Sequence, residues 1–235
     1  MHLFYAPDIK ETNELPKEEA QHCVKVLRLK EGDKITITDG VGSLYKAEIA
    51  LANIKNCKVI IHEVIQSDKA WRGSLTIALA PTKNMDRNEL FVEKSTEMGI
   101  DQFFFINCFH SERKVLKTER IEKTVIAAMK QSLKALKPKV HEMISFDDFI
   151  NRPLEGDKFI AHCHPTSTKV ELKSAIKQNC PTTILIGPEG DFSEEEVELA
   201  MQKGYIPISL SPSRLRTETA GIIAAATFHL KNYIS

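Results

Sequence analysis

Two segments in the last quarter of the chain combine residue types that could bind a charged small molecule. The first, 185–193 (LIGPEGDFS), contains Gly187 and Gly190, which would let a ligand approach the backbone closely. Glu189 and Asp191 would repel a phosphate but suit a ligand with a sulfonium and an amino group. The segment lacks the GxxxxGKS/T and GxGxxG patterns, which argues against a nucleoside triphosphate or a dinucleotide. An ordinary strand-to-helix turn remains the alternative on spacing alone.

The second segment, 208–220 (ISLSPSRLRTETA), is polar and carries Arg214 and Arg216 just before a stretch of small residues. Two arginines beside a ligand loop could bind an RNA phosphate or stabilise negative charge on a base. The small residues at 220–227 would let a helix pack closely, either within the fold or against a passing chain. Ser193 and Glu196 form a capping box that sets the start of the helix after the first segment.

The elements around these segments alternate between strand and helix from residue 74 onward. We expect strands at 75–80, 102–108, 140–144, 158–163, 183–186 and 206–210, and helices at 86–98, 119–136, 146–151, 169–179, 194–203 and 217–233. Such alternation predicts an α/β fold with a mostly parallel sheet and helices on both faces. Both segments then follow strands at the carboxyl edge of the sheet, where ligands bind in such folds.

The first 70 residues have a different, β-rich pattern. Alternating apolar residues predict strands at 34–39, 44–51 and 58–64, and a helix is expected at 17–29. Short strands joined by tight turns suggest a small barrel. The polar stretch 66–73 resembles a linker, so we expect two domains, 1–70 and 71–235.

Composition excludes several classes of protein. The chain has 32 basic and 32 acidic residues, which argues against nonspecific coating of nucleic acid but leaves basic patches possible. No apolar run approaches the roughly 18–20 residues that span a bilayer, and the N-terminus lacks a signal-peptide pattern. We therefore expect a cytoplasmic protein with no membrane partner.

Cysteine and histidine usage gives little support for a metal site. The five cysteines are odd in number and form no CxxC pair, which argues against disulfides or a four-cysteine zinc site. In the run His162-Cys163-His164, neighbouring side chains on a strand would point to opposite faces, so one ion could hardly reach all three. We expect no metal, and we expect His162 to line the ligand pocket.

The sequence resembles the RsmE family of SPOUT methyltransferases, which methylate N3 of a uridine in small-subunit ribosomal RNA. The resemblance covers nearly the whole chain. It is carried by HCVKVLRL at 22–29 with Gly32-Asp33, DRNE at 86–89, KSTEMG at 94–99, SER at 111–113, Gln131-Ser132, IGPEG at 186–190 and LRTETA at 215–220. The last two motifs, in this order and at this spacing, are the most specific.

The resemblance implies a PUA-like N-terminal β-barrel at 1–70 and a SPOUT domain at 71–235 whose parallel sheet is tied in a deep trefoil knot. It implies a homodimer with the pocket near the subunit interface, and S-adenosylmethionine bound bent between the knot loops. The implied cofactor-binding residues are His162, Leu185, Ile186, Gly187, Pro188, Glu189, Gly190, Ser209, Leu210, Ser211, Leu215, Arg216 and Thr217.

The resemblance also implies roles in methyl transfer. N3 of uridine carries a weakly acidic proton, and Arg216 is the first candidate to stabilise charge on the base. Glu189 is a candidate proton acceptor, although a structural or cofactor-binding role fits it equally. The implied substrate is small-subunit ribosomal RNA, within an assembled subunit. Candidate RNA contacts are His22, Lys25, Arg28, Arg87, Lys94 and Arg113.

Alternatives remain for several of these assignments. Arg87 and Lys94 could instead form helix ion pairs with nearby glutamates, and His22 could be a packed polar residue. The protein could act on another base or on a ribose 2′-hydroxyl, or it could be an RNA-binding assembly factor without catalysis. The chain also departs from the family pattern at His2, Leu133-Lys134, Asp191 and Ser211, and the family usually has glycine at the last two positions.

Overall fold

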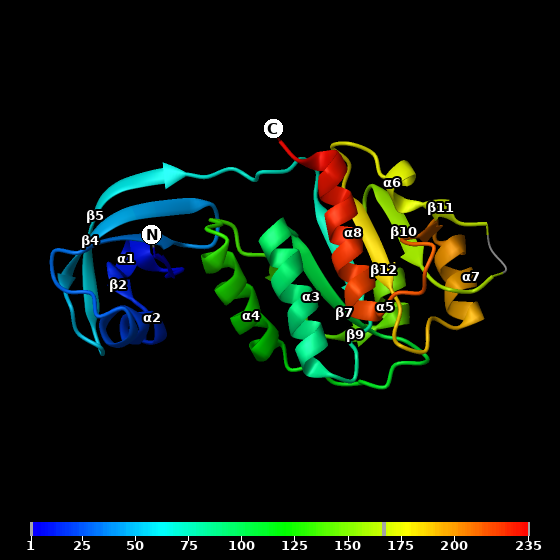
Figure 1. The fold of residues 1–235 in the computed structure, drawn as a ribbon, viewed down its shortest axis with the longest axis horizontal. Helices are drawn as coiled ribbons and strands as arrows, with labels where there is room; N and C mark the ends of the chain where they lie inside the picture. Colours follow the sequence, from blue (N-terminus) through cyan, green and yellow to red (C-terminus); the bar gives the residue numbers. More distant parts are fainter. Residues whose placement is uncertain (1, 166–167, 235) are drawn as a thin grey trace. The chain divides into compact units, whose positions relative to one another are not determined.

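The computed structural model describes residues 2–165 and 168–234, which form two compact units. The N-terminal unit contains the chain up to Lys69 together with Ile126–Lys137. The C-terminal unit contains Ala70–Val125 and the chain from Pro138 onward. Figure 1 traces the chain in colours that follow the sequence.

The N-terminal unit is built on a barrel-like sheet whose described strands run in the order β1-β3-β4-β5-β2. They are β1 (Leu3–Tyr5), β2 (Glu14–Leu15), β3 (Lys34–Thr38), β4 (Ser43–Leu51) and β5 (Cys57–Gln66). Most of β4 alternates between buried and half-buried residues, as expected for a strand with one face on a core. The three strands expected here are confirmed, while β1, β2 and helix α1 (Ile9–Thr12) were too short to predict.

The helix expected at 17–29 is shorter and irregular. The α-helix α2 (Lys17–Gln21) continues as the π-helical segment η1 (His22–Val26). The Leu27 N–H donates to the carbonyl of His22, five residues back. Arg28 then takes a left-handed conformation with φ of 55°, which ends the helix.

The C-terminal unit contains a parallel sheet whose described strands run in the order β11-β13-β10-β12-β6-β7-β8, with β9 also paired to β7. The strands are β6 (Leu75–Leu79), β7 (Gln102–Asn107), β8 (Lys139–Val140), β9 (Ile144–Ser145), β10 (Asp157–Ala161), β11 (Val170–Glu171), β12 (Thr182–Ile186) and β13 (Ile206–Ser209). Every residue of β6 and β12 is buried, as in a parallel sheet covered on both faces. The expected α/β class is confirmed.

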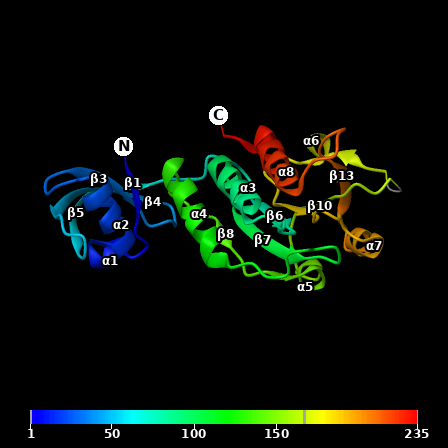
Figure 2. The ribbon, with the colours of Figure 1, turned by 60° about the horizontal axis from the view of Figure 1, so that its bottom comes forward.

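Helices cover both faces of this sheet (Figure 2). One core joins the sheet to α3 (Met85–Met98), the first half of α4 (Thr118–Gln131), α6 (Leu172–Ala175) and α8 (Thr217–Asn232). The opposite core joins it to α5 (Phe146–Ile150) and α7 (Glu194–Gln202). Neighbouring residues of β6 enter opposite cores, Ile77 the first and Ala78 the second.

Three expected elements differ from the structure. The helix expected at 169–179 is mostly absent, because Val170 and Glu171 pair with β13 and only Leu172–Ala175 is helical. The strand expected at 140–144 is replaced by β8 and β9, which both pair with β7. The helix expected at 119–136 ends at Gln131, because Leu133 has a left-handed φ of 56°.

The early end of α4 has a clear cause in the N-terminal unit. After the helix ends, the carbonyl of Ala135 accepts hydrogen bonds from the Thr38 hydroxyl (3.0 Å) and the Gly42 N–H (3.1 Å). The Lys137 N–H donates to the carbonyl of Gly40 (2.8 Å). If the helix continued, the Ala135 carbonyl and the Lys137 N–H could not reach the β3–β4 turn. Hydrogen bonds between segments far apart in the sequence therefore override the local helix propensity.

Candidate active site

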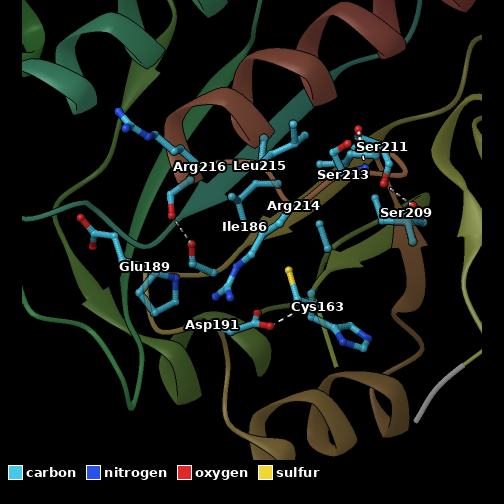
Figure 3. A pocket seen from close by; sticks show the side chains of 18 of the residues that line it. Cys163, Ile186, Glu189, Asp191, Ser209, Ser211, Ser213, Arg214, Leu215 and Arg216 are labelled. Atoms are coloured by element: carbon cyan, nitrogen blue, oxygen red, sulfur yellow. Dashed lines mark hydrogen bonds between the residues drawn. The ribbon is translucent and has the colours of Figure 1, made fainter. Parts of the chain in front are cut away.

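A cavity of about 760 Å³ lies at the carboxyl ends of β10, β12 and β13 (Figure 3). Parallel strands place their following loops at one edge of the sheet, which is why segments far apart in the sequence meet here. The lining comprises Ala161, His162 and Cys163 after β10, Ile186–Glu189 and Asp191 after β12, residues 208–217 at the end of β13 and after it, and Arg87, Lys169 and Ala220.

Most of the expected cofactor-binding residues line this cavity, with two exceptions. Among the described residues, Leu185 and Gly190 are not part of the lining. The Leu185 side chain is fully buried in the core beneath α5 and α7. Gly190 faces the loop after β7, and a Cβ there would lie 2.9 Å from the Cβ of His110. Close packing within the protein therefore requires this glycine.

Asp191 ties the loops after β10 and β12 together. Its Oδ2 accepts the N–H of Cys163 at 2.7 Å, and its Oδ1 accepts the N–H of Phe192 at 2.9 Å. Its φ is 67°, in the left-handed region that favours glycine but that aspartate also tolerates. This conformation explains how aspartate can stand where the family usually has glycine, and the side chain adds two anchoring hydrogen bonds.

The loop after β13 is shaped by its own hydroxyl groups. The Ser209 hydroxyl donates to the carbonyl of Ser211 at 3.1 Å, and the Ser211 Oγ accepts the N–H of Ser213 at 3.1 Å. Ser211 therefore closes a local turn at the second position where glycine is usual. The Thr217 hydroxyl donates to the carbonyl of Gly187 at 3.1 Å, which joins this loop to the one after β12.

The two arginines of this loop are both exposed, but they point differently. In Figure 3 the side chain of Arg214 extends toward Asp191, whereas that of Arg216 extends away from it. Arg216 is also the N-cap residue of α8, with an extended ψ of 154°. Both arginines line the cavity, whereas the sequence assigned a role in methyl transfer to Arg216 alone.

Acidic and basic groups share the cavity. The Oε1 of Glu189 accepts the N–H of Lys83 at 3.2 Å, which holds this carboxylate at the cavity wall. Arg87 lines the cavity from α3, and its Nε lies 3.8 Å from the Oε1 of the buried Glu218 in α8. Lys169 also lines the cavity, and sequence analysis missed it because the segment was expected to form a helix.

His162 lines the cavity as an uncharged ring. It is 7% exposed, and burial, with a smaller contribution from Lys169, lowers the pKa of its imidazole from 6.5 to about 4. It is therefore neutral at physiological pH.

No group of three or more His, Cys, Asp or Glu in the described residues could hold a metal ion. Among the helices of the described residues, none combines the length and the apolar composition that a membrane span requires.

The expected RNA contacts fall into two groups. Lys94 lies 2.6 Å from a Glu93 oxygen and 3.0 Å from a Glu97 oxygen, so the ion-pair alternative is the one that the structure shows. Arg113 donates to the carbonyls of Thr82 and Lys83, which uses its guanidinium inside the protein.

Among the other expected contacts, only two have exposed side chains. Arg87 pairs with Glu218 instead of the neighbouring glutamates considered from the sequence. In the N-terminal unit, Lys25 and Arg28 are exposed. His22 is half-buried, with its ring centroid 6.2 Å from that of Phe4 in an edge-on arrangement.

Comparisons with known proteins agree with this geometry. Residues 69–229 match the model of the RNA methyltransferase domain, and residues 15–61 match that of the RNA methyltransferase PUA domain. The Ribosomal RNA small subunit methyltransferase E of Rickettsia conorii is 29% identical over 92% of this chain and 89% of its own.

Solved structures extend the match to the fold. The "probable rRNA-methyltransferase" from Porphyromonas gingivalis superimposes with a TM-score of 0.92 at 43% identity, covering 98% of both chains. The Ribosomal RNA small subunit methyltransferase E of Neisseria gonorrhoeae, bound to S-adenosylmethionine, has a TM-score of 0.87 at 25% identity and covers 99% of this chain and 98% of its own. The family model spans more than half of the chain and these relatives match it almost from end to end, so the chain belongs to the RsmE family of RNA methyltransferases.

Proposed function

We propose that this protein transfers a methyl group from S-adenosylmethionine to N3 of a specific uridine in the RNA of the small ribosomal subunit. The observation that carries the proposal is the cavity that the loops after β10, β12 and β13 form together. Relatives with this fold are named small subunit methyltransferases, and one was solved with S-adenosylmethionine bound.

The lining fits the chemistry of that cofactor. A cavity of about 760 Å³ is within the ordinary size range of ligand pockets. Ile186, Ile208 and Leu210 offer apolar contact for an adenine ring, while Glu189 and Asp191 offer negative charge near a sulfonium and an ammonium group. The neutral His162 adds a polar wall without opposing charge. When bound, S-adenosylmethionine supplies an activated methyl group on a positively charged sulfur.

The chain's own residues would then position the base and manage its charge. Methyl transfer to N3 requires loss of the N3 proton, which leaves negative charge shared with the flanking carbonyl oxygens. We propose that the arginines of the β13–α8 loop, Arg216 first, stabilise this charge. The hydrogen bond from the Lys83 N–H favours a structural role for Glu189 over proton transfer.

We further propose that the C-terminal unit is tied in a deep trefoil knot. The support is the crossed strand order, in which β13 lies between β11 and β10 and β12 lies between β10 and β6, together with the return of α8 to pack on α3 and β6. The hydrogen bond between Thr217 and Gly187 links the β13–α8 loop to the β12–α7 loop. Such a linkage would hold both cavity walls at a fixed separation. Exposed Lys25 and Arg28 are proposed as RNA contacts of the N-terminal unit.

We propose that the protein is a homodimer that uses the outer face of α8. Leu230 is 85% exposed, and Ile223 lies seven residues earlier, on the same side of the helix. Leu90 of the neighbouring α3 is also exposed. Apolar side chains exposed together on packed helices are typical of surfaces that associate.

The decisive experiment is methylation of purified small ribosomal subunits, compared with naked ribosomal RNA, followed by mass spectrometric mapping of the modified base. N3-methyluridine formed in the assembled subunit would support the proposal. Methylation of another base or of a 2′-hydroxyl would contradict the assignment. Failure to bind S-adenosylmethionine in calorimetry would instead indicate a noncatalytic RNA-binding factor.

A further inference from the structure

One phenylalanine of the C-terminal unit breaks the burial pattern of all the others. The chain has 11 phenylalanines, and within the described residues ten of them are 4% exposed or less. Phe109, in the loop between β7 and α4, is 78% exposed. A large apolar ring is less stable in water than buried in a protein or against a ligand. This exposure therefore suggests a ligand that covers the ring.

The loop that carries Phe109 is firmly anchored. The N–H of Phe109 donates to the Oε1 of Glu196 at 2.8 Å, and the N–H of Cys108 donates to the Ser111 Oγ at 2.9 Å. Arg113 fastens the far side of the loop to the carbonyls of Thr82 and Lys83. The ring is thus presented outward by a fixed backbone and would lose little entropy when a ligand covers it.

The same loop adjoins the wall of the candidate active site. His110 Nδ1 shares a hydrogen bond with the carbonyl oxygen of Asp191 (3.1 Å), and Asp191 lines the cavity. The Cβ of His110 packs so closely on Gly190 that no side chain would fit there. The His110 ring also stands edge-on to that of Phe109, with centroids 4.9 Å apart. Phe109 is therefore one residue away from a direct contact with the cavity wall.

Exposed cations accompany the exposed ring. Lys114 and Lys117 follow in the same loop, and both are exposed. Lys83 is exposed as well and pairs with Glu112 at 3.1 Å. An exposed aromatic ring in a loop that also carries exposed lysines is suited to single-stranded nucleic acid, where bases stack on the ring and phosphates meet the cations.

We propose that Phe109 is a stacking platform for an unpaired nucleotide next to the target uridine. By holding that neighbour outside the RNA stack, it would help present the target base to the cavity. This inference rests on the proposed function, because it takes RNA as the substrate. The exposed Lys114 and Lys117 of the same loop favour RNA over an apolar protein surface as the occupant.

The test compares four full-length variants with the wild type, using S-adenosylmethionine and small ribosomal subunits. Phe109→Ala removes the ring, Phe109→Leu keeps apolar bulk without the ring, and Phe109→Trp keeps an aromatic face. Val115→Ala, at a similarly exposed position of the same loop, is the matched control. Stacking is worth about 1–3 kcal/mol per base, so Phe109→Ala should raise KM for the subunit by roughly 5- to 150-fold.

The expected pattern is specific to stacking. Phe109→Trp should restore KM, Phe109→Leu should not, and the affinity for S-adenosylmethionine should stay unchanged in all four variants. The single tryptophan of the chain, Trp71, is buried, so the exposed indole introduced by Phe109→Trp should report stacking by fluorescence quenching on RNA binding. A wild-type KM in Phe109→Ala, full restoration by leucine, or dissociation of an oligomer in Phe109→Ala would each overturn the proposal.

The outcome is separable from that of the proposed function. If the wild type does not methylate the subunit, the proposed function fails. If the wild type methylates and Phe109→Ala does so with an unchanged KM, only the stacking role fails.

Discussion

The Thr217 hydroxyl donates a hydrogen bond to the carbonyl oxygen of Gly187 at 3.1 Å. These residues are 30 positions apart in the sequence: Thr217 begins α8, and Gly187 directly follows β12. Through this bond the two segments that carry the candidate chemistry become adjoining walls of one cavity. Changes that loosen either wall should therefore affect cofactor affinity before they affect the rest of the fold.

Asp191→Ala should destabilise the protein and weaken cofactor binding. The change removes two hydrogen bonds to a charged acceptor, each worth about 1.5–3 kcal/mol, and places alanine at a φ of 67°. Urea unfolding would measure the loss of stability, and calorimetry would measure the affinity for S-adenosylmethionine. Asp191→Asn, which tolerates the same φ and keeps an acceptor, should lose less. Equal behaviour of the two variants would show that the hydrogen bonds are unimportant.

Arg216→Ala should lose activity while keeping its affinity for S-adenosylmethionine. If Arg216 stabilises charge on the base, removing it should lower kcat about 100- to 1000-fold, as for other groups that stabilise a developing charge. Single-turnover methylation of small subunits would measure this loss. Arg214→Ala is the matched variant, since both side chains line the cavity from the same loop. Wild-type turnover in Arg216→Ala would refute the assignment, and a loss confined to Arg214→Ala would transfer the role to that residue.

The stability of the protein should fall as the pH is lowered from about 6.5 toward 4. His162 and His141 both have a pKa lowered to about 4, mainly by burial, whereas their ordinary value is 6.5. Below pH 6.5 the unfolded chain therefore binds more protons than the folded one, so acid favours unfolding. For the buried His162 alone the loss could reach about 3 kcal/mol by pH 4.

Urea unfolding between pH 7.5 and 4.5 would test this expectation. His162→Gln, which cannot be protonated, should show a shallower decline than the wild type across that range. Above pH 7, position 162 should contribute no pH dependence to the free energy of unfolding in either protein. An identical acid decline in both proteins would mean that His162 does not titrate as its burial implies.

Gly221→Ala should destabilise the fold although alanine is the better helix former. A Cβ at this position of α8 would lie 2.5 Å from Phe91 of α3 and 3.1 Å from Leu79 of β6. Overpacking of this kind costs about 1–3 kcal/mol, while the gain in helix propensity is about 1 kcal/mol. Thermal unfolding should therefore give a lower Tm. A raised Tm would show that Phe91 moves aside without cost.

Substitution of Leu230 by glutamate should separate the proposed dimer. Because the side chain is 85% exposed in the single chain, its replacement should leave the fold of the monomer intact. Light scattering would measure the mass, and circular dichroism would verify the fold. Val41→Glu, at an exposed apolar position of the N-terminal unit, is the control and should keep the wild-type mass. A wild-type protein that is already monomeric would contradict the proposed dimer.

Much of the site could be predicted because its signals are local. Strands 183–186 and 206–210 are short apolar runs followed by polar loops, and these runs require only their own residues to be recognised. The Ser193 and Glu196 capping box is a contact across three positions, and the structure contains it as expected. The glycines and acidic residues of the first loop pointed to a cationic ligand, and the arginines of the second pointed to an RNA phosphate or to negative charge on a base. The family motifs pointed to the enzyme class.

Contacts between distant segments decided the rest. Residues 169–179 have helix-compatible spacing, yet Val170 and Glu171 complete the sheet edge beside β13, which brings Lys169 to the cavity. The sequence made Arg113 a candidate RNA contact, but in the structure its guanidinium donates hydrogen bonds to the carbonyls of Thr82 and Lys83. Periodicity indicates which face of an element is apolar. It does not indicate which distant residue will bind a charged side chain or which distant strand will pair with a sheet edge. For this protein the sequence by itself determined most of the elements, the two ligand loops and the family. Only the tertiary structure decided where the remaining elements end, which charged side chains the protein uses internally and which remain for a ligand.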